Sequence, residues 1–265
     1  MIFELLILGA IAGFTIFLGL PIARMTTVSA KFKGMLNAAA AGVLLFLLVE
    51  IMEHAFEATS DSVLEALSGT TTFQSGLLYL FLLVLGVAIG LLGLVWFEGR
   101  YLKSQNTNEF TSLSESRAKR IAMMIAIGIG LHNFSEGLAI GQSYANGVIS
   151  LALLLVIGFG LHNATEGFGI AAPLSGYKPK WRFLALTGFI AGGPTFVGSI
   201  IGGFWISPAI SVFFLALAAG AIIYVIKELL YHGRIKGEGL SVMSFLLLGL
   251  FIGYGTELLI EFAGG

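Results

Sequence analysis

Long apolar stretches constrain this chain more than any other feature, because each is long enough to cross a membrane. A helix rises 1.5 Å per residue, so about 20 apolar residues cross a hydrocarbon core of about 30 Å. Only 11% of the residues are charged, which is far less than the surface of a water-soluble domain requires. The stretches also lack the alternation typical of barrel strands. The sequence therefore predicts an all-α, polytopic membrane protein.

Eight transmembrane helices are predicted within a single transmembrane domain, residues 1–265. The predicted spans cover approximately residues 2–23, 34–56, 75–97, 120–144, 148–172, 182–205, 209–230 and 240–262. The longest connection, 98–119, is polar, and we expect it to form a flexible cytoplasmic loop. The chain contains no cysteine, so disulfides and thiolate metal sites are excluded.

The basic residues indicate how the spans are oriented. All 14 Lys and Arg residues fall in, or within a few residues of, the connections between spans 1 and 2, 3 and 4, 5 and 6, and 7 and 8. The positive-inside rule makes this side cytoplasmic, so we expect both termini outside and a location in the cytoplasmic (inner) membrane. The outer connection between spans 2 and 3 is acidic instead, with Glu57, Asp61 and Glu65. No basic cluster indicates nucleic-acid binding; the lipid bilayer is the expected surrounding.

One motif occurs twice, near the middle of the fourth and fifth spans. His, Asn and Glu recur in the same order and spacing, as His132, Asn133, Glu136 and His162, Asn163, Glu166. Successive helical residues advance by about 100°, so the three side chains of each motif share one face, with Glu between His and Asn. The two spans are adjacent and antiparallel. We therefore expect two imidazoles, two carboxylates and two amides to converge at the membrane midplane.

These groups are typical ligands of a transition metal. An unpaired carboxylate at the bilayer centre costs at least about 2.5–3.5 kcal/mol, and neither span carries a Lys or Arg at this depth. A divalent cation would neutralise both carboxylates and bind the imidazoles. Two His and two Glu suit Zn²⁺, Fe²⁺ or Mn²⁺ better than Ca²⁺ or Mg²⁺. Hydrogen bonding between helices is the structural alternative. The order of the side chains leaves room for one metal or two, with each Glu shared.

A second repeat relates spans 1–3 to spans 6–8. Span 2 has Ala-Ala-Gly at 40–42 followed by Glu50 and His54, and span 7 has Ala-Ala-Gly at 218–220 followed by Glu228 and His232 at the same offsets. Matching spans are five apart, so the copies are inverted in the membrane, a pattern typical of transporters. Chance similarity of Gly/Ala-rich helices is the alternative. The same four residues are candidate entrance and exit contacts for a metal, which solvated helix ends explain almost as well.

The motifs at 132–137 and 162–167, on the fourth and fifth of eight spans, resemble those of the ZIP (Zrt/Irt-like) divalent metal transporters of prokaryotic type. This resemblance implies uptake of zinc, or of iron, manganese or cadmium, into the cytoplasm, with the metal as substrate and no cofactor. It assigns His132, Glu136, His162 and Glu166 to a primary metal site. Asn133 and Asn163 are assigned to an adjacent second position that shares both Glu residues.

The resemblance also implies a homodimer and an elevator-like motion of spans 1, 4, 5 and 6 against spans 2, 3, 7 and 8. Small-residue faces at Gly86 and Gly90 and at Gly249 and Gly253 favour a dimer contact. Two features depart from the family pattern. Many members have proline where Ser135 and Thr165 stand, and some add an acidic ligand from span 6, which here offers only Thr195 and Ser199.

Three other functions compete with metal import. A metal exporter or exchanger would use similar ligands, because the residues themselves do not set the direction of transport. An intramembrane zinc hydrolase would need an open coordination position, and four protein ligands leave little room for one. Haem ligation by His132 and His162 would place two carboxylates in an apolar pocket. We therefore predict a transporter and not an enzyme.

Overall fold

The structure is a computed structural model that describes residues 2–24, 29–101, 115–204, 207–232 and 239–262. Within these ranges the chain is helical and contains no strand. The eight α-helices are α1 (Ile2–Phe14), α2 (Ala30–Ser68), α3 (Phe73–Tyr101), α4 (Glu115–Ala145), α5 (Ile149–Ala171), α6 (Trp181–Gly202), α7 (Pro208–His232) and α8 (Gly239–Phe262). Three short 3-10 helices are η1 (Thr15–Leu18), η2 (Leu20–Arg24) and η3 (Ala172–Leu174).

Seven of the described helical segments are long and apolar enough to cross a membrane, and α8 adds a shorter apolar segment, Gly239–Gly255. Their surfaces remain apolar, as for Phe81 on α3 and Phe189 on α6, which are both well exposed. Exposed apolar rings suit contact with lipid and would be unfavourable in water. These features confirm the prediction of an all-α, polytopic membrane protein. Much of the predicted cytoplasmic loop, residues 102–114, lies outside the described residues.

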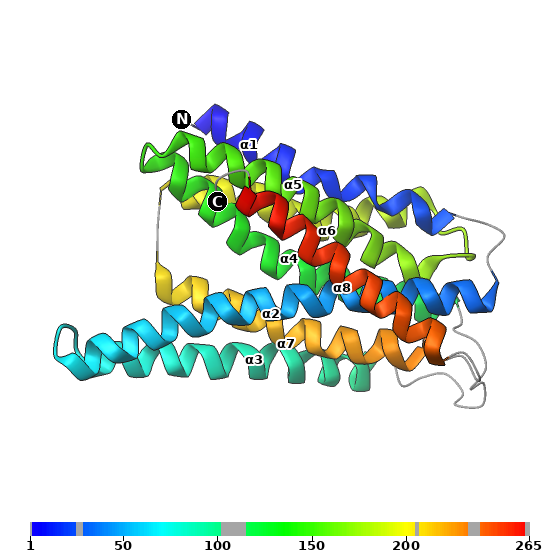
Figure 1. Ribbon diagram of the computed structural model, residues 1–265, viewed down its shortest axis with the longest axis horizontal. Helices are drawn as coiled ribbons and strands as arrows, with labels where there is room; N and C mark the ends of the chain where they lie inside the picture. The colour runs from blue at the N-terminus through cyan, green and yellow to red at the C-terminus, as the bar shows by residue number, and fades with distance from the viewer. Residues whose placement is uncertain (1, 25–28, 102–114, 205–206, 233–238, 263–265) are drawn as a thin grey trace.

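The helices form two groups that lie side by side (Figure 1). In one group α6 packs along α4 and α1, and α5 packs against α4 and α1. In the other group α7 packs along α3, while α2 packs against α8, α7 and α3. The groups meet mainly where α4 contacts α7 and where α5 contacts α2 and α8. The two helices that carry the repeated motif therefore lie at the junction between the groups.

The first group is held together by backbone contacts at glycines. A Cβ atom added at Gly137 of α4 would lie 2.2 Å from the carbonyl oxygen of Thr195 on α6, and one added at Gly198 would lie 2.3 Å from that of Phe134. No side chain fits in so little space. Small residues allow helices in membranes to approach closely, since lipid tails provide no hydrophobic force between helices.

The small-residue faces expected to support a dimer are instead used within the chain. A Cβ at Gly90 of α3 would lie 2.0 Å from the carbonyl oxygen of Leu217 on α7, and one at Gly249 of α8 would lie 1.9 Å from that of Ala39 on α2. That part of the prediction was wrong. Glycines spaced along one helix face indicate that another helix packs closely there, but the sequence does not indicate whether that helix belongs to the same chain or to a second subunit.

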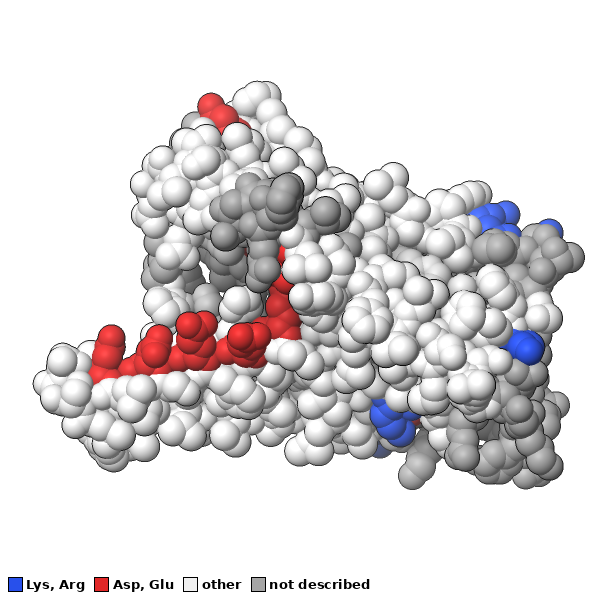
Figure 2. Space-filling model, in the orientation of Figure 1, with Lys and Arg blue, Asp and Glu red and all other residues white. Residues whose placement is uncertain are grey.

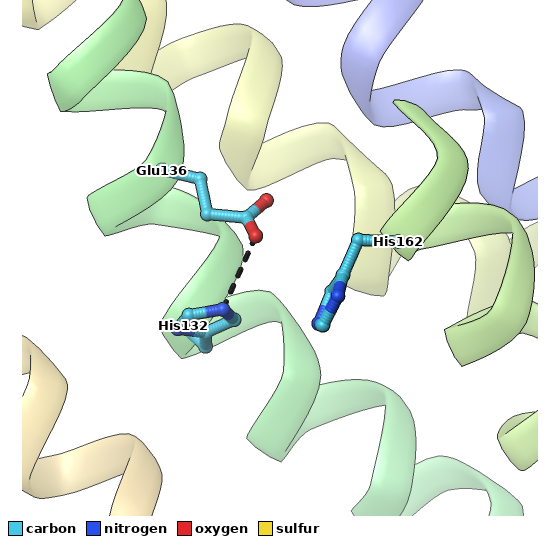
Figure 3. A group of neighbouring side chains, drawn as sticks. All are labelled: His132, Glu136 and His162. Carbon is cyan, nitrogen blue, oxygen red and sulfur yellow. Dashed lines mark ion pairs between the residues drawn. The ribbon is translucent and has the colours of Figure 1, made fainter. Parts of the chain in front are cut away.

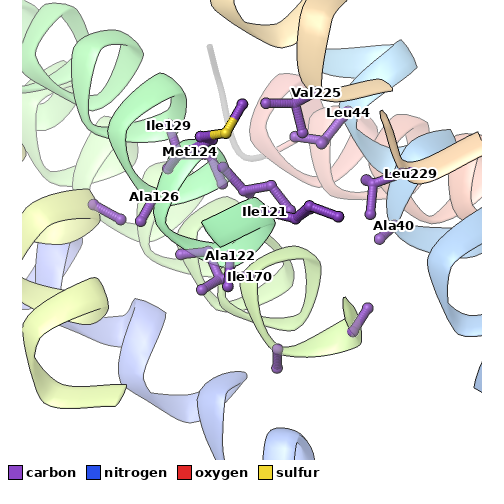
Figure 4. Close-up of a cluster of buried hydrophobic side chains, with 14 of the residues drawn as sticks. Ala40, Leu44, Ile121, Ala122, Met124, Ala126, Ile129, Ile170, Val225 and Leu229 are labelled. Atoms are coloured by element: carbon purple, nitrogen blue, oxygen red, sulfur yellow. The ribbon is translucent and has the colours of Figure 1, made fainter. Parts of the chain in front are cut away.

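An apolar layer fills the junction between α4, α2 and α7 (Figure 4). Ile121 and Met124 of α4 belong to the same buried cluster as Leu44 of α2 and Val225 of α7. These α4 residues lie between its first turn, at Glu115, and the first motif, at His132. The path from that end of the bundle to the motif is therefore packed with apolar side chains.

Helix α2 extends well past the predicted end of its span at residue 56. It has 39 residues, which corresponds to a length of about 58 Å, nearly twice the hydrocarbon core. Ser29 caps its N-terminus by accepting a hydrogen bond from the Phe32 backbone, and Gly69 ends it in the left-handed conformation, with φ of 80°. The outer acidic residues, expected in a loop, therefore lie on a helix that projects from the bundle together with α3 (Figure 1).

Candidate metal centre

The two motifs face each other across α4 and α5 (Figure 3). One ligand atom each from His132, Glu136 and His162 lies within 4.8 Å of the others. On α4, His132 Nε2 is 3.2 Å from Glu136 Oε1, and on α5, His162 Nε2 is 3.7 Å from Glu166 Oε1. All four residues are at most 4% exposed. The fourth predicted ligand, Glu166, lies outside this 4.8 Å group. Ligand atoms around tetrahedral zinc are separated by about 3.3 Å, so side-chain movements would be needed to complete such a shell.

The donor atoms of this cluster are poorly satisfied by the protein. Both ring nitrogens of His132, Nε2 of His162, Oε2 of Glu136 and Oε1 of Glu166 are buried without a hydrogen-bond partner in the described structure. Among the ion pairs of the described residues, neither carboxylate contacts a Lys or Arg. Each is paired only with the histidine of its own motif. Buried polar atoms are normally hydrogen-bonded, so this set of donors is suited to a cation.

The two asparagines lie on the other side of the glutamates and are fully buried. Asn133 Nδ2 donates to Asn163 Oδ1, and is 3.1 Å from both Glu166 Oε2 and the backbone oxygen of Ala191 on α6. Asn163 Nδ2 donates to the backbone oxygen of Ala12 on α1, at 3.1 Å. The amides thus link all four helices of this group. Sequence reasoning did not find the two backbone acceptors, since any residue type provides a carbonyl.

The family relationship follows from comparison with known proteins. A family model described as ZIP Zinc transporter matches residues 101–261, which is more than half of the chain and includes both motifs. The chain belongs to the ZIP zinc transporter family. Because members of this family are transporters, the hydrolase alternative is excluded and the prediction that this chain is not an enzyme is confirmed.

Individual ZIP family relatives match the same part of the chain. Zinc transporter ZIP6 of Homo sapiens is 31% identical over 160 residues, which cover 56% of this chain and 21% of the relative. Zinc transporter foi of Drosophila melanogaster is 28% identical over 151 residues, which cover 55% of this chain and 21% of the relative. The chain thus spans about a fifth of the length of the curated relatives it matches.

The candidate entrance residues lie within electrostatic range of the candidate metal centre. Glu50 on α2 is partly buried and lies within electrostatic range of Glu136, Glu257 on α8 and Glu53. His54 is exposed, one turn farther out, and within electrostatic range of His132. A chain of carboxylates therefore leads from the metal centre toward the outer end of α2.

An acidic row continues this chain along the projecting part of α2. We define it as Glu53, Glu57, Asp61 and Glu65, which recur every four residues and are all exposed. Figure 2 shows acidic side chains in one line on the side of α2 that faces the other helix group. The basic residues visible in this view lie at the opposite end of the molecule. The four-residue spacing is typical of one face of a helix, whereas the sequence analysis placed Glu57, Asp61 and Glu65 in a connection between spans.

The candidate exit residues are not brought to the metal centre. Glu228 on α7 is 4% exposed, forms an ion pair with Lys227, and lies 3.7 Å from Arg117 Nη2 on α4. The contact with Arg117 links α7 to α4 and so joins the two helix groups at the Lys- and Arg-rich end. The side chain of His232 lies outside the described part of the structure.

Proposed function

We propose that this chain carries divalent transition-metal ions, chiefly zinc, across the membrane into the cytoplasm, through the centre formed by His132, Glu136, His162 and Glu166. The convergence of three of these donors within 4.8 Å, in a buried site without basic partners, is the observation that carries the proposal. Two imidazoles and two carboxylates favour zinc, and admit iron, manganese or cadmium. The names of the relatives, both zinc transporters, support the same cargo.

The proposal is tested by zinc uptake into proteoliposomes loaded with a zinc-sensitive dye. We expect flux in liposomes containing the wild-type chain and at least about a tenfold lower rate for His162→Ala, because the change removes a ligand. Phe189→Ala, on the exposed face of α6, serves as a control. Wild-type liposomes no faster than empty ones would contradict transport. A preference for outward flux in sided preparations would favour the exporter.

The acidic row provides a second expected result, because exposed carboxylates near an entrance concentrate cations. We expect the triple variant Glu57→Gln, Asp61→Asn, Glu65→Gln to raise the zinc concentration needed for half-maximal flux about tenfold at low salt and to leave the maximal rate unchanged. The difference should vanish in 1 M salt, where the screening length falls to about 3 Å. Ser60→Ala and Ser68→Ala, on the same helix, are the matched controls. A lower maximal rate at saturating zinc would contradict a purely electrostatic role.

An elevator-like motion fits the two groups of helices. The group α1, α4, α5 and α6 carries every ligand of the proposed centre, and the group α2, α3, α7 and α8 would form the stationary part. The apolar layer between the centre and the basic end must part before an ion reaches the cytoplasm, which requires such a rearrangement. Gly42 and Gly220, the matched glycines of the inverted repeat, pack closely on α8 and α3 respectively, and these contacts hold the proposed stationary group together.

The remaining expectations belong to the same proposal. The chain would lie in the cytoplasmic membrane with both termini outside. In agreement with this, α1 begins and α8 ends toward the acidic end of the bundle (Figure 1). A homodimer would use an exposed apolar face of the stationary group, such as that of α3 around Leu77, Phe81 and Val84.

A further inference from the structure

A small slot separates α6 from α7 where both lie beside α4. The described parts of α6 and α7 make almost no contact with each other, although the two helices are consecutive in the sequence. The slot between them has a volume of about 100 Å³, and Leu138 of α4, Ile201 of α6 and Ile210 of α7 are among its lining residues. The described residues that line it include no proposed metal ligand. The slot is therefore a separate feature from the metal centre.

The slot runs along α4 and changes from apolar to polar. At the end nearer the metal centre it is lined by the rings of Phe134 and Phe214, whose centroids are 4.9 Å apart. Polar side chains, Gln142 of α4 and Ser211 of α7, line it toward the end of the bundle where α4 finishes and α7 begins. A helix advances by about 12 Å from Phe134 to Gln142. The slot thus has an apolar end within the membrane and a polar end toward the membrane surface.

The walls of the slot belong to different helix groups. On one side, α4 and α6 touch through their backbones: a Cβ atom added at Gly202 would lie 2.3 Å from the carbonyl oxygen of Leu138. On the other side, α7 belongs to the second group and meets α4 through side chains, as at Phe214 and Phe134. Any displacement of α7 relative to α4 would change the width of the slot. A protein side chain that filled the slot would have to be accommodated at every width.

The surroundings of the slot indicate an apolar occupant from the bilayer. Apolar cavities in proteins stay dry, and one of about 150 Å³ takes up benzene. The slot is smaller, so it suits the unbranched end of a hydrocarbon chain better than a ring. Ile201 shares its face of α6 with Val197 and Phe204, four residues before it and three after it, and both are exposed. An exposed apolar face within a span suits lipid contact, so the slot borders the lipid-facing surface.

We propose that the slot binds the end of an acyl chain of a bilayer phospholipid. The acyl chain passes Ile201 and reaches Phe134 and Phe214, and the polar part of the lipid lies on the side of Gln142 and Ser211. An empty slot would cost its walls their packing contacts. A flexible acyl chain supplies these contacts and can leave or return as the width changes. The site is present in the described arrangement, whether or not the two helix groups slide.

The experiment labels the full-length protein in nanodiscs of phosphatidylcholine, a small fraction of which carries a diazirine at the end of one acyl chain. After irradiation, mass spectrometry locates the labelled residues. We expect label at Phe134 and Phe214 in the wild type. In Ser211→Phe this label should fall by at least about tenfold, because a phenyl ring fills the space of the acyl chain. Label at Phe189, on the exposed face of α6, should not change and serves as the internal reference.

Further variants separate filling of the slot from other effects of the substitution. Ser211→Ala should keep the label, because the Ser211 hydroxyl bonds only the Ser207 carbonyl of its own segment, at 3.4 Å. Leu138→Phe should lose the label, since it fills the same space from α4. Leu186→Phe adds the same ring at an exposed position of α6 and should keep the label.

Equal labelling of Phe134 in the wild type, Ser211→Phe and Leu138→Phe would refute the site, because the label would then come from ordinary contact with surrounding lipid. Absence of label at Phe134 and Phe214, with Phe189 labelled, would also refute it. If Ile201→Cys proteins formed disulfide-linked dimers and the slot carried no label, the occupant would be a second copy of the protein. The labelling does not require transport, so its failure leaves the proposed metal centre untouched.

Discussion

Zinc flux is expected to fall by at least about 100-fold when either Glu136 or Glu166 is replaced by alanine, since changes beyond the direct ligands already cost 10- to 100-fold in affinity. Each change removes a buried carboxylate that faces a histidine, and leaves two imidazoles with one anionic partner. The measurement is initial uptake into proteoliposomes at matched protein content. Both variants should retain the helical content of the wild type, because each deletes an uncompensated buried charge.

Glu115→Ala is the matched control for this pair of variants. It removes a carboxylate from the same helix, at an exposed position in the first turn of α4, where Glu115 pairs with Lys119 at 2.6 Å. Its flux should equal that of the wild type. Because Asn133 and Asn163 are neutral and lie beside the carboxylates, we expect their alanine variants to retain more flux than either glutamate variant. Zinc flux that is unchanged in both glutamate variants would overturn the assigned site.

Covalently joining α4 to α7 is expected to stop transport altogether. A Cβ atom at Gly128 of α4 would lie 3.4 Å from the Cβ of Ala221 on α7, close to the separation found in disulfides. The double variant Gly128→Cys, Ala221→Cys would therefore tie the group that carries the ligands to the proposed stationary group. The chain has no cysteine of its own, so this would be its sole disulfide. Oxidation should abolish zinc flux, and reduction should restore it.

The control joins two helices of the same group. A Cβ atom at Gly76 of α3 would lie 3.1 Å from the Cβ of Ala66 on α2, so Gly76→Cys, Ala66→Cys offers a disulfide that does not cross the junction. Its flux should not depend on oxidation. The single variants Gly128→Cys and Ala221→Cys should also transport in both states. Full flux through a quantitatively oxidised α4–α7 link would rule out sliding of one group against the other.

Periodicity and composition were sufficient for the fold class and for the faces of the motifs. The angle of about 100° per residue placed His132 and Glu136 on one side of α4, where the structure shows them in contact. The packing partners of glycine faces were not predictable. Gly90 and Gly249 fit the backbones of α7 and α2 within the chain, and the sequence offers no feature that distinguishes such a partner from a second subunit.

Two further features could not be derived from residue types. The continuation of α2 to Ser68 contradicted the expected loop, because the hydrophobicity that marks a span ends near residue 56 whereas the helix ends only at Gly69. The amide network at Asn133 depends on the carbonyl of Ala191, and a carbonyl is present at every position of the chain. Side-chain chemistry suggests ligands for Asn133 and Asn163, and only the three-dimensional arrangement shows which atom of each amide faces the carboxylate.

The glycine contacts between α4 and α6 determine how firmly the ligands are placed. Added Cβ atoms at Gly137 and Gly141 would lie 2.2 and 2.1 Å from backbone oxygens of α6, so main chain rests directly on main chain. Between most helices, a layer of side chains absorbs small displacements by changing rotamers. No such layer of side chains separates α4 from α6 at Gly137 and Gly141. The first motif is thus held by a rigid backbone contact, and we expect this backbone to set the size of the ion that the proposed centre prefers.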